Sequence, residues 1–253
     1  MSNFLKKILL SIEIIVNVCT LHFELNIYVF HNQLNIIFST SLSITIITSF
    51  FIGLIFSLQI VKEFLYLNAV NLIGSVLSIS FLRELSPVLT SIILIGKIGS
   101  LFTAELATMS MTEQLDALYV LGINPINYLV KPRIIAFILI LPLLNGISFI
   151  TSILSSCFIC YLLYNIEPIL FFKSVFSILS LLDILKSTIK VLIFAFFISL
   201  ISCVWGLTSS GGAKGVGEST TSAVIISLIF IFMLDFILSY CMFNDLDSSL
   251  KIL

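Results

Sequence analysis

The residues most able to do chemistry in this chain are ionisable side chains within or beside long apolar segments. They are Arg83, Glu84, Lys97, Glu105 and Asp235. A charge in a membrane-spanning segment is costly, so it normally faces the interior of a helix bundle or a wet path for a substrate or ion. Arg83 and Glu84 precede a proline, where a helix is disturbed. We predict that they form either a polar spot on such a path or an anchor that holds a helix end.

The other three ionisable groups suit structural ion pairs. Lys97 and Glu105 are eight residues apart, so on one helix they would project within about a quarter turn of each other. Either could therefore pair with a group on a neighbouring helix. Asp235 could equally be structural.

Enzymatic chemistry finds little support in the sequence. The two histidines, His22 and His31, lie in the N-terminal region, and no His/Glu cluster has metal-ligand spacing. No G-x-S-x-G nucleophile elbow is present. The Gly-rich stretch 206–217 lacks the Gly-Lys-Ser/Thr ending of a P-loop, so we expect this chain to bind no ATP, other cofactor or metal. Cys157 and Cys160 have redox-motif spacing inside an apolar segment, and we expect them to be packing residues.

The composition requires lipid as the solvent for most of the chain. Of 253 residues, 59% are hydrophobic and only 10% are charged, and the net charge of −1 gives no electrostatic basis for nucleic-acid binding. Several charge-free runs reach or approach the roughly 20 residues that cross a bilayer. Backbone groups in hydrocarbon need internal partners, and the two-residue alternation of a barrel is missing, so these runs must be helices. The predicted fold class is all-α, a polytopic membrane protein.

We expect a membrane domain over residues 39–243, preceded by an N-terminal region (1–38) and followed by a tail (244–253). The five predicted spans are 39–61, 87–109, 134–161, 191–207 and 223–243. Each is bounded by charged residues, by glycine or proline, or by polar links.

The segments between the spans are expected to be irregular. Residues 64–86 should approach the second span as a broken or re-entrant segment, which survives at that depth only where protein or a wet cavity covers it. Residues 165–187 should be a loop with a partly apolar segment. The Gly-rich link 208–221 should be a flexible turn, and a hydroxyl of residues 219–221 should cap the last helix.

Residues 4–24 have the pattern of an amphipathic helix on the membrane surface. Their polar side chains fall on one narrow stripe at helical spacing, which consists of Lys6, Glu13, Asn17, Thr20 and Glu24. Apolar residues cover the remaining faces, and Lys6 and Lys7 would lie near anionic headgroups. An imperfect first span is the alternative.

Residues 110–122 form a short amphipathic helix between two long apolar segments. Ser110 should cap this helix, with Glu113 three residues later as in a capping box, and Gly122 should end it. About eleven residues give a length of about 16 Å. The helix carries Glu113, Gln114, Leu115, Asp116 and Leu118. A rigid helix of this size suits a groove in a partner protein, where it can pass motion to the spans on either side.

Basic residues outside the spans indicate an orientation. With five spans, Lys131, Arg133, Lys214 and the N-terminal lysines lie on one side of the membrane, in agreement with the positive-inside tendency. Lys186 and Lys190 fall on the opposite side, which weakens this orientation.

The residues alone leave several membrane functions open. A transporter subunit could be driven by a protein that docks on the short helix. A secondary transporter could instead be coupled to an ion through Glu84, Lys97 or Glu105, although such proteins usually show inverted repeats that are absent here. A non-transporting scaffold could use the short helix to recruit a partner. An intramembrane enzyme ranks last because no nucleophile–base pair is present.

A specific resemblance narrows these alternatives. Residues 83–133 read RELSPVLTSIILIGKIGSLFTAELATMSMTEQLDALYVLGINPINYLVKPR. This block resembles the signature of the MlaE-type permeases of lipid ABC transporters. The resemblance continues at FFIGLIFSLQ (50–59), LPLL (141–144) and TSSGGAKGVGESTTSAV (208–224), and covers most of the chain from about residue 48 to residue 243.

The resemblance implies a homodimeric permease with five spans and one coupling helix, which would be the short helix at residues 111–121. A separate P-loop ATPase would bind that helix from the cytoplasmic side and use ATP to rock the two permeases. A phospholipid would move through a cavity between them, and an MCE-domain protein on the opposite side would exchange lipid with the cavity. The chain would thus be a transporter subunit and not an enzyme.

The resemblance also implies roles for individual residues. Those at the ATPase contact would be Glu113, Gln114, Leu115, Asp116 and Leu118. Those that border the lipid path would be Gly53, Leu54, Phe56, Arg83 and Glu84. The abundance of Phe, Ile, Leu, Ser and Asn suggests an AT-rich genome and a plastid-encoded member in the inner envelope, with a bacterial inner-membrane protein as the alternative.

Overall fold

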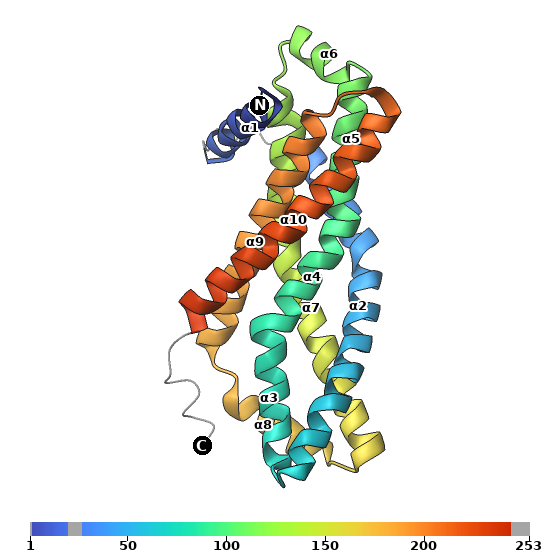
Figure 1. Ribbon diagram of the computed structural model, residues 1–253. Helices are drawn as coiled ribbons and strands as arrows, with labels where there is room; N and C mark the ends of the chain where they lie inside the picture. Colours follow the sequence, from blue (N-terminus) through green and yellow to red (C-terminus); the bar gives the residue numbers. More distant parts are fainter. Residues whose placement is uncertain (1, 20–26, 244–253) are drawn as a thin grey trace. The chain divides into compact units, whose positions relative to one another are not determined.

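The protein is built from helices throughout the part of the chain that the structure describes. This computed structural model describes residues 2–19 and 27–243. Within them, the segments long and apolar enough to cross a membrane are Tyr28–Tyr66, Val70–Met111, Ile126–Tyr164, Leu181–Leu207 and Gly212–Met242. The predicted all-α membrane fold with five spans and an N-terminal helix is confirmed (Figure 1). Thr20 and Glu24 of the predicted polar stripe and the tail 244–253 lie outside the described residues.

The helices follow one another with short connections. In chain order they are α1 (Ser2–Cys19), α2 (Ile27–Tyr66), η1 (Val70–Leu72), α3 (Ile73–Ser80), η2 (Phe81–Leu85), α4 (Ser86–Leu94), η3 (Ile95–Gly99), α5 (Ser100–Met111), α6 (Gln114–Val120), η4 (Ile126–Val130), α7 (Lys131–Tyr164), α8 (Pro168–Ile178), α9 (Leu181–Leu207) and α10 (Gly212–Phe243). The η1 segment is a 3-10 helix, whereas η2, η3 and η4 are π-helical turns.

The chain divides into two compact units. Unit 1 takes its described residues from Met1–Ser41, Ser91–Leu141 and Leu192–Met233, and unit 2 from Leu42–Thr90, Pro142–Val191 and Leu234–Leu253. Each unit has its own apolar core, so each is described separately.

The core of unit 1 joins α1, α5, η4, α7 and α9. It is formed by Ile14, Leu106, Ile126, Val130, Ile134, Leu200, Cys203 and Val204. Ile14 is fully buried, so one face of α1 packs on the unit. Nζ of Lys7 lies 4.2 Å from the centre of the Trp205 ring, and burial lowers the pKa of this lysine. The location of α1 at the membrane surface stays a prediction.

The core of unit 2 joins α2, α3, η2, α7 and α8. It is formed by Val61, Ile73, Leu77, Phe81, Ile153, Cys157, Cys160, Ile166, Phe171 and Val175, so the two cysteines are packed in the core. The short helix α8 lies along α3 (Figure 1), and Oγ of Ser75 donates to the carbonyl oxygen of Ser174 at 2.9 Å. Small residues let these helices approach closely, as is common in membranes.

The second span differs from the prediction. Residues 64–86 do not form a re-entrant segment, because α2 continues to Tyr66 and the chain reverses at Asn68, where φ is 53°. From Val70 to Met111 the helix is then continuous. The expected disturbance around Arg83 and Glu84 is present, but it takes the form of the π-helical turn η2 inside the span. A π-helical turn changes the direction of a helix while its backbone groups remain hydrogen-bonded.

Other predicted features of the helices also differ. Residues 165–187 are mostly helical, since α8 is followed by α9, which begins at Leu181. The last helix begins at Gly212 after a turn at Gly211, where φ is 101°, so most of the Gly-rich link is helical. The hydroxyls of residues 219–221 donate to carbonyl oxygens within this helix and do not cap it. The first span extends back to Tyr28.

The close contact between α2 and α7 in unit 2 can be tested at Gly53. A Cβ there would lie 2.6 Å from the carbonyl oxygen of Ser152 and would also meet Oγ of Ser155, whereas a Cβ at Gly146 would meet nothing within 4 Å. We expect Gly53→Ala to lower the free energy of unfolding in detergent by about 1–3 kcal/mol, because the added methyl group would overpack the contact between α2 and α7. Gly146→Ala should leave thermal unfolding unchanged, and equal stability of the two variants would contradict this packing.

Candidate functional site

A buried lysine joins four groups within unit 2. Lys190 of α9 is 0% exposed, and its Nζ donates to the carbonyl oxygen of Arg83 at 3.0 Å, Oε2 of Glu84 at 2.9 Å and Oγ of Ser239 at 2.8 Å. These contacts use the three N–H groups of an ammonium. Oδ1 of Asp235 lies 2.6 Å from the same Nζ as a second ion pair. The ammonium therefore holds η2, α9 and α10 together.

The sequence around Pro87 explains why Lys190 contacts a backbone oxygen. In an α-helix the carbonyl of Arg83 would accept from the residue four positions later, but that residue is Pro87, which has no N–H. Lys190 donates to this carbonyl instead. A buried carbonyl needs a donor, particularly in a membrane. The π-helical turn and the lysine thus compensate together for the proline.

The Arg83 side chain makes a second link between η2 and α9. Its Nη2 lies 2.8 Å from Oδ1 of Asp183, and both side chains are largely buried. Asp183 lies in the first turn of α9, where its backbone N–H donates to Oγ of Ser180 and its Oδ2 accepts from that hydroxyl at 2.6 Å. Capping therefore fixes the carboxylate that binds Arg83.

We call these five groups the Lys190 cluster: Arg83, Glu84, Asp183, Lys190 and Asp235. With all of them ionised, the cluster holds two positive and three negative charges. The Glu84 side chain is 44% exposed, against 0% for Lys190 and 20% for Asp235. Glu84 is thus the member through which a charged or polar ligand could contact the cluster.

The structure places the predicted lipid-path residues in different surroundings. Arg83 and Glu84 both belong to the Lys190 cluster. The ring of Phe56 packs against Phe81, the first residue of η2, with ring centres 5.5 Å apart. Gly53 is buried at the contact between α2 and α7, and Leu54 is half-buried. The assignment of these residues to a lipid path stays a prediction.

Sequence reasoning missed Lys190 and Asp183 because it placed the start of α9 in a loop. Their spacing contains a usable signal, since Asp183, Lys186 and Lys190 recur every three or four residues and share one face of an otherwise apolar helix. Lys186 also donates to the carbonyl oxygen of Met242, at 2.6 Å. Both lysines therefore lie inside α9 and not in a loop, and the predicted orientation stays a prediction.

The two ionisable residues of the second span behave differently. Glu105 pairs with Arg133 of α7 at 2.8 Å, so the predicted ion pair to a neighbouring helix is confirmed for Glu105. Lys97 is exposed and forms no ion pair within the described ranges. Asp235, for which the sequence left a structural role open, forms an ion pair with Lys190.

The predicted short helix is present as α6, with a different beginning. α5 continues to Met111, and Glu113 precedes α6 in the left-handed region, with φ of 58° and no side-chain cap. The predicted capping box is therefore wrong, because Ser110 still belongs to α5. The end is as predicted: Gly122 has φ of 76° and donates its N–H to the carbonyl of Tyr119. Together with a bond from Ile123 to Leu118, this forms a Schellman motif.

The exposed surface of α6 combines acidic and apolar side chains. α6 lies beyond the end of α5 in unit 1 (Figure 1), where Leu115 is buried and Glu113, Gln114 and Asp116 are exposed. Leu118 is half-buried. At the end of α6, Val120 is 87% exposed and Leu121 72% exposed. Adjacent large apolar side chains on an exposed turn are candidates for contact with a partner protein or with lipid.

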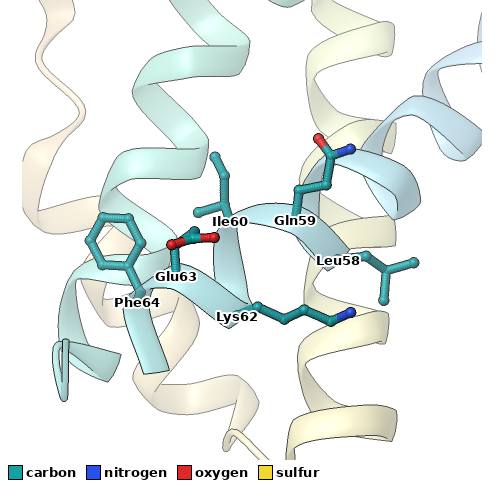
Figure 2. Close-up of a pocket in the computed structure, with 6 residues that line it drawn as sticks. All are labelled: Leu58, Gln59, Ile60, Lys62, Glu63 and Phe64. Carbon is teal, nitrogen blue, oxygen red and sulfur yellow. The ribbon is translucent and has the colours of Figure 1, made fainter. Parts of the chain in front are cut away.

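Each unit has a surface hollow near charged residues. In unit 1, a hollow of about 500 Å³ between α1 and α6 is lined by Leu9, Glu13, Asp116, Tyr119 and Ile126 among others. In unit 2, a hollow of about 570 Å³ is lined by Leu58, Gln59, Ile60, Lys62, Glu63 and Phe64 (Figure 2). All six come from α2, and Lys62 and Glu63 point away from each other (Figure 2), so the second hollow has no convergent polar groups. Among the described residues, no group of His, Cys, Asp and Glu could hold a metal.

Removal of the Lys190 ammonium should destabilise the protein strongly. Lys190→Met leaves Glu84 and Asp235 close together without a cation, which should cost about 3–5 kcal/mol in the free energy of unfolding. Simultaneous neutralisation in Lys190→Met/Glu84→Gln/Asp235→Asn should recover part of this loss, because no carboxylate is then left without the ammonium, although the carbonyl of Arg83 still lacks its donor. Lys214→Met is the control, because Lys214 is 88% exposed. Equal thermal stability of Lys190→Met and this control in detergent would refute the stabilising role of the Lys190 ammonium.

Comparisons with known proteins give the family. Residues 30–241 match the family described as Permease MlaE. The "Probable ABC transporter permease protein ycf63" of Pyropia yezoensis is 53% identical, over 86% of this chain and 83% of its own. A "Probable ABC transporter permease protein" of Synechocystis is 48% identical, over 84% and 81%. "Protein TRIGALACTOSYLDIACYLGLYCEROL 1, chloroplastic" of Arabidopsis thaliana is 47% identical, over 83% of this chain and 60% of its own.

The matched region contains both features described above, the Lys190 cluster and α6. The resemblance seen in the sequence is therefore confirmed over most of the chain. The protein is integral to a membrane, and its relatives come from a chloroplast and from bacteria. This chain belongs to the MlaE permease family and is a membrane subunit of an ABC transporter.

Proposed function

We propose that this chain moves phospholipid or a related membrane lipid between membranes, powered by a separate ATPase subunit. The observation that carries the proposal is α6, a short exposed helix between two candidate spans of an MlaE-family permease. The name of the Arabidopsis relative refers to a galactolipid, which supports a lipid as the transported molecule.

A P-loop ATPase would dock on α6. The contact would involve Glu113, Gln114, Leu115, Asp116 and Leu118, together with the exposed apolar turn at Val120 and Leu121. The acidic N-terminal half of α6 would contact basic groups of the ATPase, and the apolar turn would enter a groove on the ATPase surface. ATP would be bound and hydrolysed by the partner, because the Gly-rich stretch of this chain has no P-loop ending.

The lipid would pass close to η2. Glu84 is the exposed edge of the Lys190 cluster, and Phe56 packs next to the same turn. An ionisable group that remains accessible within a span marks a substrate path. In the proposed assembly two copies of the chain form the cavity, and an MCE-domain protein on the other side of the membrane exchanges lipid with it. A plastid inner envelope, with α6 in the stroma, is the proposed location.

Charge reversal on α6 tests the docking. Glu113→Lys/Asp116→Lys should abolish co-purification of the ATPase while the permease remains folded, because both side chains are exposed and Leu115 beneath them is unchanged. Glu63→Lys/Glu167→Lys is the matched control, with the same charge change at exposed acids of unit 2. Undiminished ATPase association in the α6 variant would refute the docking surface.

Reconstitution tests the transport. In proteoliposomes with its co-purified partners, the chain should move a fluorescent phospholipid only when ATP is supplied. Glu84→Gln should slow this movement by roughly tenfold or more, since a hydrogen bond to a charged group contributes about 1.5–3 kcal/mol. Movement driven by an ion gradient without an ATPase would favour a secondary transporter. Partner binding with no lipid movement would favour a scaffold.

A further inference from the structure

Two charged side chains on either side of α6 are joined inside unit 1. Glu105 lies in α5, which leads into α6, and Arg133 lies near the start of α7, which follows α6 and η4. Nη2 of Arg133 is 2.8 Å from Oε2 of Glu105. The Arg133 side chain is 6% exposed and the Glu105 side chain 40%. An ion pair therefore joins α5 and α7, the helices before and after α6.

The guanidinium of Arg133 has few other anchors. It lies over the ring of Phe102, 5.7 Å from its centre, and this ring packs in turn against Phe137. Its Nε and Nη1 are buried without a hydrogen-bond partner in the described part of the chain. A buried arginine needs a counter-charge, so Glu105 is the group that holds Arg133 in place.

A third helix grips the same part of α5. Oγ1 of Thr103 donates to the carbonyl oxygen of Ser202 in α9 at 3.0 Å. Next to this bond, a Cβ at Gly206 would lie only 2.7 Å from Cβ of Leu106, so the two backbones are in close contact. The end of α5 cannot slide along α9 without loss of these contacts. The ion pair between Glu105 and Arg133 fixes α5 to α7 as well.

We infer that Arg133 and Glu105 are positioning residues that make α5, α6 and α7 move as one rigid lever. A push on α6 enters α5 at its C-terminal end and α7 at its N-terminal end. With the ion pair in place both helices are displaced together, and the motion reaches the spans. Without it, α6 moves against its flanking helices, and less lipid is moved for each ATP hydrolysed. This inference rests on the proposed function.

The test separates a lever from a merely structural contact. Glu105→Gln/Arg133→Met removes both charges at once, so no uncompensated charge is buried and folding should be retained. The assembly co-purified with its ATPase is reconstituted in liposomes, and ATP hydrolysed and fluorescent phospholipid moved are measured in the same sample. Hydrolysis and ATPase association should stay near wild type, while the lipid moved per ATP should fall about fivefold or more.

The control is an exposed ion pair in the same unit. Lys214 and Glu218 lie 3.8 Å apart with both side chains in solvent, so Lys214→Met/Glu218→Gln should change neither quantity. A lipid-per-ATP ratio at the wild-type value in the Arg133 double variant would overturn the lever. A parallel fall of hydrolysis and lipid movement, with the ratio unchanged, would overturn it as well.

A second variant decides the matter if the double variant fails to assemble. Arg133→Lys keeps the charge beside Glu105 but replaces the planar guanidinium by a flexible ammonium. The lever predicts a lowered ratio with normal hydrolysis, whereas an unchanged ratio contradicts it. Failure of the proposed function itself would show earlier, because the wild-type assembly would then move no lipid on addition of ATP.

Discussion

A charge that is taken out of water into a membrane domain has to be neutralised by the protein, and this requirement shapes unit 2. The Lys190 ammonium is fully buried and is held by Glu84, Asp235, Ser239 and the carbonyl of Arg83. Helix–helix association in lipid lacks the hydrophobic driving force that operates in water. Contacts from one cation to η2, α9 and α10 therefore contribute specificity that apolar packing alone would not give. Among the carboxylates of the Lys190 cluster, Glu84 is the most exposed, at 44%.

The backbone imposes a parallel constraint on the second span. Pro87 removes a hydrogen bond from the carbonyl of Arg83, and the helix responds with the π-helical turn η2 and with the lysine of α9. The π-helical turn and the contact from Lys190 thus both compensate for the hydrogen bond that Pro87 removes. This explains how a residue pair that looks like a helix break in the sequence lies inside a continuous span.

Unit 1 uses its polar contacts differently. α6 is fixed at its end by the Schellman turn at Gly122 and on its inner face by the buried Leu115. Its outer surface is exposed. The helices before and after it are tied by Glu105 and Arg133, and α5 is held on α9 at Gly206. An exposed surface on a rigid support is what an energy-coupling contact needs, because a soft support would absorb the displacement.

The sequence by itself determined the all-α membrane fold, the five spans, the short helix ended by Gly122 and the family, because hydropathy, glycine and signature residues are local properties. It also indicated that Arg83, Glu84 and Asp235 were unusual. Only the tertiary structure decided what these residues contact. Lys190, which the prediction placed next to a loop, is the buried centre of the Lys190 cluster. Glu105 pairs with Arg133, which follows α6 in the chain. Boundaries such as the start of α6 at Gln114 were also missed. The physical reason is that ion pairing and the π-helical turn depend on which helices become neighbours, and one sequence's periodicity does not encode that.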